Sequence, residues 1–171
     1  MWKLQSLRTL IESAVPDLKA NPENLIVAAS SGRVVSTMGV SLSFEYAYTI
    51  EITVLDFTGH TDALFVPLNA WLRVHQPELL QNPDTQATGL QFQVELLNTA
   101  GADVGIKVPV TERVIVKPDP NHPTRMNCEH PPEPQVIGTN RLPEHWELWF
   151  RDEKLAEWDI PTPPEEARFV L

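Results

Sequence analysis

Two side chains that could serve an active site lie close together in the sequence: Arg73 and His75, within the stretch LFVPLNAWLRVHQPELL at residues 64–80. In an enzyme, an arginine can clamp an anionic substrate while a histidine acts as general base. On a helix, each residue turns by about 100°, so two side chains that are two positions apart point in nearly opposite directions. The pair therefore cannot converge on one substrate. We interpret His75 as the end of a core-facing stripe, and Arg73 as a solvated or intersubunit side chain.

The same stretch carries a polar stripe. Asn69, Arg73 and Gln76 recur at spacings of four and three, so on a helix they share one face. The opposite face carries the residues expected to pack on a core: Leu64, Leu68, Trp71 and Leu72. We expect the polar stripe to be available to a neighbouring subunit.

Motifs for catalysis and for metal binding are absent from the sequence. It contains no GxGxxG or GxxxxGK[ST] phosphate loop, no GxSxG elbow and no HExxH pair. His122, Cys128 and His130 are the only conceivable metal cluster, and their spacing matches no familiar zinc pattern. A single cysteine excludes an intrachain disulfide. We expect no cofactor and no bound metal.

Two carboxylates share one face of a long predicted strand. In SLSFEYAYTIEITVLDF, residues 41–57, apolar residues occupy every second position over most of the length. Glu45 and Glu51 lie on the other face, six residues and about 20 Å apart at the rise of a strand. That separation is too large for glycosidase-type acid–base work. We interpret this Thr- and Glu-rich face as a wet or interfacial surface.

The hydrophobic patterns of the chain predict an α+β protein in which two main helices pack on a mostly antiparallel (mixed) sheet and position these residues. The helices are expected at 3–15 and about 66–75, the second starting late because a proline is tolerated only in the first turn. Strands are expected at 24–37 (as a hairpin), 41–57, 89–97, 103–110 and 112–117. Pro109 cannot donate to a ladder and predicts an edge strand. We take residues 1–117 as the core domain.

The remaining third of the chain divides into three predicted parts. Residues 118–144 are proline-rich and predict an extended strap or linker. Residues 145–160 predict a C-terminal β-hairpin, with Trp146 and Trp149 on opposite sides. Because an isolated hairpin is marginal in water, we expect its tryptophans to dock on the core or on a neighbouring subunit. Residues 161–171 predict a flexible tail.

Charge and hydropathy narrow the class of protein. The net charge is −10, and residues 119–171 contain 5 basic and 11 acidic side chains. Such a chain is a poor candidate for gripping a phosphate backbone, so we expect no specific nucleic-acid binding. No run of 18 apolar residues predicts a membrane span, and the first residues do not form a secretory signal. We expect the protein in the cytoplasm.

Extended similarity points to a family. The segment DALFVPLNAWLRVHQPELL, with SLSFEYAYTIEITVLDFTGH before it and LQFQVEL and VPVTERVIV after it, resembles the tail completion protein R family of P-two-like contractile-tailed phages. The hairpin HWELWFRDEKLAEW resembles that family too. The resemblance implies a non-enzymatic structural protein of virion assembly, encoded by a phage or prophage, that finishes the tail so that it can join a DNA-filled head. It also implies a two-layer domain like that of tail terminators.

The resemblance further implies partners. Tail terminators form a ring, usually hexameric, on the end of the tail tube, so we expect self-association, contact with tube, sheath and head–neck proteins, and DNA passing through the ring. Assembly would take place in the host cytoplasm, and the protein would remain in the virion tail. Our candidate oligomer-interface residues are Asn69, Arg73, Gln76, Glu45, Glu51 and Trp149.

Two other functions stay open from the residues alone. An interaction adaptor of host or prophage origin would use PPEP and PTPP as proline-rich ligands for another domain. A small hydrolase would use His75 or His145 together with a carboxylate or a serine, although no motif supports it.

Overall fold

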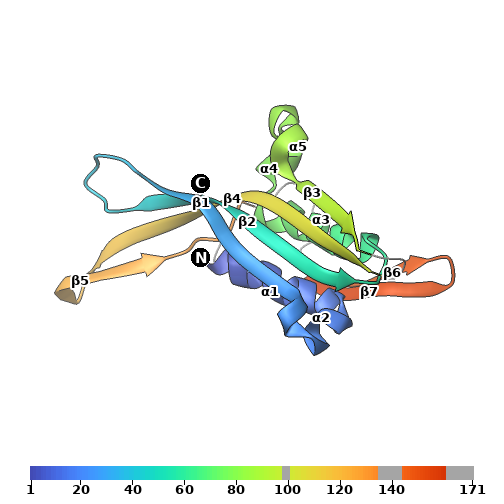
Figure 1. Ribbon diagram of the computed structural model, residues 1–171. Helices are drawn as coiled ribbons and strands as arrows, with labels where there is room; N and C mark the ends of the chain where they lie inside the picture. Colours follow the sequence, from blue (N-terminus) through green and yellow to red (C-terminus); the bar gives the residue numbers. More distant parts are fainter. Residues whose placement is uncertain (98–100, 135–143, 161–171) are drawn as a thin grey trace.

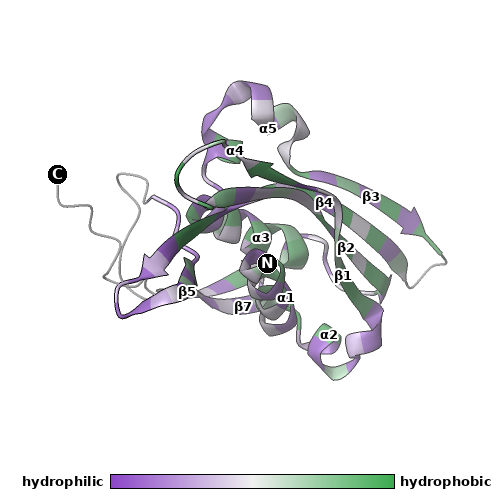
Figure 2. Ribbon diagram, turned by 90° about the vertical axis from the view of Figure 1, so that its left-hand side faces the viewer, coloured by the Kyte–Doolittle hydropathy of each residue, from purple (hydrophilic) through white to green (hydrophobic). Residues whose placement is uncertain are grey.

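The fold is α+β, with two helices packed against one face of a curled antiparallel sheet (Figures 1 and 2). The computed structural model describes residues 1–97, 101–134 and 144–160. The sheet order is β1-β2-β4-β3, and β5 pairs with the far end of β4. The strands are β1 (Leu25–Ser36), β2 (Phe44–Phe57), β3 (Gln91–Leu96), β4 (Ala102–Asp119) and β5 (His122–Glu129).

The two main helices supply the second layer. They are α1 (Trp2–Ala14) and α3 (Asp62–His75). Short helical segments connect the larger elements: α2 (Pro16–Ala20), the 3-10 turn η1 (Pro22–Asn24), α4 (Glu78–Gln81) and α5 (Pro83–Gly89). No helix of the described residues is long and apolar enough to cross a membrane.

The core forms where alternate residues of the central strands meet the helices. Ile50 and Ile52 of β2 face their partners Val108 and Ile106 of β4, and all four side chains are buried. Cross-strand partners share one face of a sheet, so the period of two in the sequence places these residues together. Against them pack the apolar stripes of the helices: Leu7, Ile11, Ala14, Leu64, Leu68, Trp71 and Leu72.

Three details differ from the sequence-based expectation, and two of them concern proline. The hairpin expected at 24–37 is instead the single strand β1, which pairs with β2 along its length and has an irregularity in register between Ser30 and Arg33. Helix α3 starts at Asp62, earlier than predicted, and contains the buried Pro67; the apolar face around it offsets the cost of the missing amide hydrogen bond. The strand with Pro109 is not an edge strand, since β4 lies between β2 and β3. Thr49 of β2 lies opposite Pro109, but the pairing of β3 ends at Lys107, so at Pro109 one side of β4 has no strand that needs a donor.

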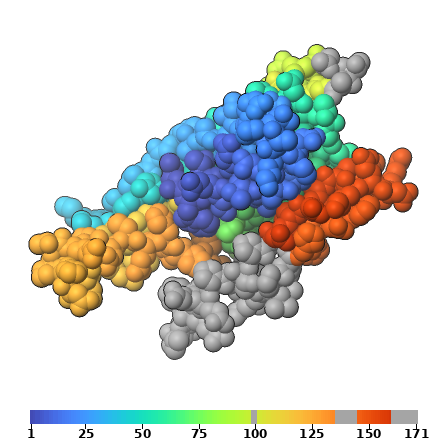
Figure 3. Space-filling view, turned by 90° about the horizontal axis from the view of Figure 1, so that it is seen from below, coloured from blue at the N-terminus to red at the C-terminus, as the bar shows by residue number. Residues whose placement is uncertain are grey.

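A second, two-stranded sheet lies beside α1 (Figure 3). It consists of β6 (Glu144–Phe150) and β7 (Glu153–Ile160). Trp158 and Ala156 of β7 are buried and join the core, whereas Trp146 and Trp149 of β6 are exposed. The hairpin therefore docks through β7, which contacts α1 and α3, and leaves most of β6 exposed.

The proline-rich region differs from the expected strap at its start. Strand β4 continues through Pro118 to Asp119, and β5 folds back on it, pairing Met126 with Pro118 and Cys128 with Val116. Pro123 is accepted because β5 lies at an edge, and Pro118 lies beyond Val114, where the pairing of β2 with β4 ends. The rest of the strap (135–143) and the tail (161–171) lie outside the described residues, and the division into domains stays a prediction.

Candidate functional site

A projecting β-structure at one end of the elongated molecule is the most distinctive surface (Figure 1). We call it the arm: residues 33–45, which contain the β1–β2 connection, and residues 113–130, which contain the end of β4 and all of β5. In the ribbon, both hairpins extend beyond the N-terminus of α1, so neither helix layer covers them. The hairpin β6–β7 lies at the opposite end of the molecule.

Large apolar side chains are exposed on the arm. Its exposed apolar residues are Val34, Val35, Met38, Val40, Leu42 and Met126. Met38 and Val40 are fully exposed. Single exposed apolar residues need no explanation, but a group of them on a projecting structure marks an interaction surface.

Two serines fix the β1–β2 connection to β4. The Ser43 hydroxyl oxygen accepts a hydrogen bond from the Val116 amide at 2.9 Å, and the Ser41 hydroxyl lies 3.3 Å from the Val116 carbonyl oxygen, to which it donates. The two hydroxyl oxygens are 2.6 Å apart. The serine side chains thus replace the ladder bonds that a continued β2 would make, and they anchor the loop that carries Met38 and Val40.

A buried carboxylate lies at the base of the arm. Glu112 is 1% exposed and accepts the backbone amides of Trp2 and Lys3, each at 3.1 Å. These are amides at the N-terminus of α1, where the helix dipole favours negative charge. The Tyr48 hydroxyl also donates to Glu112, and burial together with this carboxylate raises the pKa of Tyr48. Glu112 therefore joins the start of the chain to the middle of the sheet.

A buried ammonium group lies beside this carboxylate. Lys3 is fully buried, and its Nζ donates to the His75 carbonyl oxygen, to Gln76 Oε1 at 2.8 Å and to Glu133 Oε1 at 2.8 Å. Lys3 thereby places a positive charge at the C-terminus of α3, where the helix dipole favours it. Glu133 also lies 4.0 Å from Arg113 Nη2. The segment that follows β5 is thus tied back to α1 at the base of the arm.

His75 is part of the core. Its ring contacts the rings of Trp71 and Trp2, with centroids 4.8 and 5.2 Å apart. Burial, with a contribution from the nearby Lys3 charge, lowers the pKa of His75 to about 4. The imidazole is therefore neutral at neutral pH, and the positive charge at this end of α3 is that of Lys3.

The predicted polar stripe of α3 is only partly on the surface. Asn69 and Arg73 are exposed, but Gln76 is 2% exposed and does not belong to an outer surface. Its Oε1 accepts the Thr111 amide at 3.2 Å, which satisfies the β4 backbone beyond the end of β3. Periodicity placed Gln76 outside because α3 ends at His75, where the helical spacing no longer applies.

The other predicted interface residues lie on separate surfaces. Glu45 and Glu51 occupy the sheet face opposite the helices, as the strand period indicated. Glu51 accepts the Ser30 hydroxyl at 2.8 Å and lies 3.4 Å from Lys107 Nζ, and its pKa is lowered by these two contacts in that order. Trp149 belongs to β6, beside α1 and not on the main sheet. The structure therefore does not bring the six candidates into one patch.

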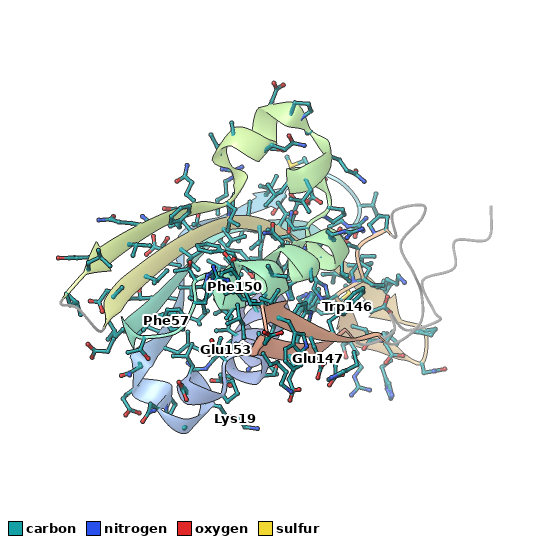
Figure 4. All side chains as sticks on the ribbon, turned by 90° about the vertical axis from the view of Figure 1, so that its right-hand side faces the viewer. Lys19, Phe57, Trp146, Glu147, Phe150 and Glu153 are labelled. Atoms are coloured by element: carbon teal, nitrogen blue, oxygen red, sulfur yellow. The ribbon has the colours of Figure 1, made fainter. Side chains whose placement is uncertain are left out.

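The hairpin β6–β7 holds the only cluster of possible metal-ligating side chains among the described residues. Ligand atoms of His145, Glu147 and Glu157 lie within 4.8 Å of one another (Figure 4 labels Glu147). Lys154 Nζ lies 2.7 Å from Glu157 and 3.4 Å from Glu147, so it already balances the carboxylates. His145 Nδ1 is 2.8 Å from Asp159, whose hydrogen bond raises the pKa of that exposed imidazole.

Strand β5 separates two members of the possible metal cluster that was considered from the sequence, His122 and Cys128. His122 and Cys128 are six residues apart on one exposed strand, which separates them by about 20 Å. These two cannot ligate one ion.

The buried charges Glu112 and Lys3 could have been found from the sequence, because both occupy inward positions in the hydrophobic pattern of their elements. Glu112 occupies an inward position in the alternating pattern of β4, between the buried Val110 and Val114. Lys3 precedes Leu7 by four residues and so belongs to the buried stripe of α1. A charged residue at an inward position indicates a buried, partnered charge.

Comparison with known proteins gives two findings. The family model of the P2 phage tail completion protein R (GpR) matches residues 1–134. The chain is 35% identical over 159 residues to the tail completion protein R of Escherichia phage P2, an alignment that covers 93% of this chain and 99% of that protein. No solved structure matches. On this similarity, which extends over nearly the whole of both chains, the protein belongs to the P2 phage tail completion protein R family.

Proposed function

We propose that this protein completes the phage tail by closing its end with a ring of identical copies, so that the tail can join a DNA-filled head. The observation that carries the tail role is family membership over residues 1–134. The ring, the contacts with tail tube, sheath and head–neck proteins, and a tail-terminator-like domain are the parts that we infer in addition. The role is structural, and we expect no catalysis.

The surface of the protein supports an assembly role. Exposed apolar residues gather on the arm, which no helix covers, whereas His75 and Lys3, the two ionisable side chains of the α1–α3 contact, are engaged in the core. The exposed arm is therefore available to protein partners, whereas the buried Lys3 and the ring of His75 hold α1 and α3 together.

Net charge supports the passage of DNA. The chain carries a net charge of −10, and a ring with an acidic inner wall repels the phosphate backbone, so DNA slides through without binding. Assembly takes place in the host cytoplasm, and the protein stays in the virion tail. The candidates for contacts between copies or with tail proteins are now Asn69, Arg73, Glu45, Glu51 and Trp149.

Electron microscopy of particles from a phage, or an induced prophage, that lacks this gene tests the role. We expect DNA-filled heads and separate tails, and joined particles again when the gene is supplied from a plasmid. Normal, head-joined tails in the mutant would overturn the proposal. Light scattering of the purified protein tests the ring: a monomer at every concentration, even with the tail-tube protein present, would overturn it.

A further inference from the structure

The edge strand β3 carries an uncovered apolar face. Phe92, Val94 and Leu96 alternate along it, and the first two pair with the buried Ile106 and Val104 of β4. Because cross-strand partners share a face, the β3 side chains point to the same side as the core. They are nevertheless 63%, 38% and 79% exposed. The edge of the core thus ends in a partly open apolar surface.

Only a small part of this face is covered by the described chain. Phe65 of α3 contacts Phe92, with ring centroids 5.0 Å apart. Within the described ranges, β3 pairs with β4 alone, so its other edge has no strand beside it (Figure 2). Proteins commonly cover or pair such an edge, because an open apolar edge strand promotes association.

The tip of the arm is the complementary feature. Met38, Val40 and Leu42 occur at alternate positions in the β1–β2 connection, and their side chains are fully or largely exposed. The hydroxyl bonds of Ser41 and Ser43 to β4 anchor this loop beyond the helices. It is therefore an apolar projection on an ordered base, suited to fill an apolar recess on another molecule.

We propose that the tip of one copy, centred on Val40, docks on the apolar face of β3 of a second copy, centred on Val94. This inference rests on the ring proposed above and names the surfaces that form it. The arm and the Leu96 end of β3 lie at opposite ends of the same long sheet (Figure 1). A copy cannot dock on itself across that length, so the contact is between molecules.

Charge around the two surfaces is complementary. The arm carries four basic residues, Arg33, Arg113, Lys117 and Arg125, against three acidic ones, Glu45, Asp119 and Glu129, whereas the whole chain is strongly acidic. Lys117 and Arg125 lie beside Glu129 and Asp119, so the exposed Arg33 and Arg113 are the charges that can face a partner. Around the end of β3, the acidic residues Glu95, Asp103 and Asp56 gather; Glu95 and Asp103 are direct cross-strand partners, and Asp103 accepts the Asp56 amide. Like charges opposite each other destabilise a sheet, and the approach of Arg33 and Arg113 from a second copy would relieve this repulsion.

The geometry of such a contact determines the assembly. It joins two different surfaces of identical copies, so it is heterologous and propagates from head to tail. In an open chain of copies, one tip and one β3 face remain uncovered at the ends. Closing the chain into a ring covers both, which favours a closed assembly over a filament wherever the angle between copies permits it.

Two single substitutions test the contact in the full-length protein. Val40→Asp and Val94→Asp each place a carboxylate in the proposed apolar contact, and we expect each to weaken self-association by at least about tenfold in sedimentation velocity, equivalent to roughly 1.4 kcal/mol. Ile26→Asp is the matched control, because Ile26 is an exposed apolar residue on β1 that lies outside both the arm and β3. It is expected to leave assembly unchanged. Urea unfolding of all variants checks that the monomer remains folded.

Cross-linking between copies provides an independent measurement. In a Cys128→Ser background, copies with Val40→Cys are mixed with copies with Val94→Cys and oxidised. A disulfide-linked pair of different copies is expected, whereas Thr9→Cys on α1 in place of Val94→Cys should give none above background.

The outcomes separate this inference from the ring itself. If the wild-type protein forms a closed oligomer that Val40→Asp and Val94→Asp leave intact, the ring stands and this contact is wrong. The same conclusion follows if Val40→Asp prevents tail completion without changing the oligomer, because the tip then binds another tail protein. A wild-type protein that is monomeric under all conditions overturns both.

Discussion

The ammonium group of Lys3 lies 2.8 Å from the carboxylate of Glu133, with the two side chains 0% and 12% exposed. This ion pair joins the first turn of α1 to the segment that leaves β5, 130 residues later in the chain. Together with Gln76 and the His75 carbonyl, which also accept from Lys3, it closes the base of the arm. A buried polar network therefore supports the base of the arm, in addition to the strand pairing that forms its two hairpins.

Removal of the buried ammonium should destabilise the protein strongly. In Lys3→Ala, Glu133 and Gln76 lose a charged partner in a region without solvent, and breaking a buried pair from one side costs about 3–5 kcal/mol. Urea unfolding measures the loss. Lys3→Met should recover part of the stability, because its apolar chain fills the space that the lysine stem occupied. Lys19→Ala, at an exposed position on α2 (Figure 4), should change the unfolding free energy little. Equal effects of Lys3→Ala and Lys19→Ala would contradict the role of the network.

Removal of the Tyr48 hydroxyl tests the carboxylate at the start of α1. Tyr48 donates to Glu112, which also accepts two helix amides. Tyr48→Phe keeps the ring and removes one donor to a buried charge, so we expect a loss of about 1–3 kcal/mol in the free energy of unfolding. Tyr46→Phe, two residues earlier on the same face of β2, is the matched control and should cost less. If the control is the more destabilised variant, Glu112 does not depend on Tyr48.

The layers of the fold could be predicted from local patterns. The period of two in β2 and β4 and the apolar stripes of α1 and α3 arise from burial on one face, and burial leaves a repeating signature in the sequence. Proline was a weaker guide. Pro67 lies inside α3, where apolar packing offsets the missing amide hydrogen bond. Pro109 lies in a central strand, but beyond the end of its pairing with β3.

The site could be predicted only in part, because its contacts join distant segments. Lys3 and Glu133 carry no local signature of their pairing, since an ion pair across 130 residues depends on how the whole sheet brings them together. Gln76 was placed on the outer stripe because helical spacing was extended one residue beyond the last helical residue, His75. The exposed apolar tip was visible in the sequence as Met38, Val40 and Leu42, but alternation alone cannot distinguish a buried strand from an exposed loop.

Charge reversal on α3 tests the remaining part of the outer stripe. Arg73 is exposed near the C-terminal end of α3. If it contacts a neighbouring copy, Arg73→Glu should weaken self-association in light scattering without lowering the unfolding midpoint of the monomer, and the effect should shrink at high salt. Lys19→Glu makes the same change of charge on the exposed surface of α2. Unchanged assembly in Arg73→Glu would identify Arg73 as a solvated side chain.

The neutral imidazole of His75 predicts a loss of stability in mild acid. Its pKa is about 4 in the folded protein, lowered from the usual 6.5 by burial and by the Lys3 charge. Between pH 6.5 and 4, the unfolded chain binds a proton at this position and the folded chain does not, so the free energy of unfolding falls as the pH is lowered. The contribution of His75 is fully present above pH 6.5 and is lost as the pH approaches 4. A shift of this size corresponds to about 3 kcal/mol.

Substitution of the ring isolates this contribution from that of the carboxylates. His75→Phe keeps an aromatic ring between Trp2 and Trp71 and removes the titrating group. Urea unfolding at several pH values between 4 and 7 should show a flatter profile than that of the wild type, by up to about 3 kcal/mol over this range. Asn127→Phe places a ring on the exposed strand β5 without removing a titrating group, and it should retain the wild-type slope. If the His75→Phe and wild-type profiles run parallel, His75 binds its proton equally well in the folded and unfolded chains, and burial between the two tryptophans does not lower its pKa.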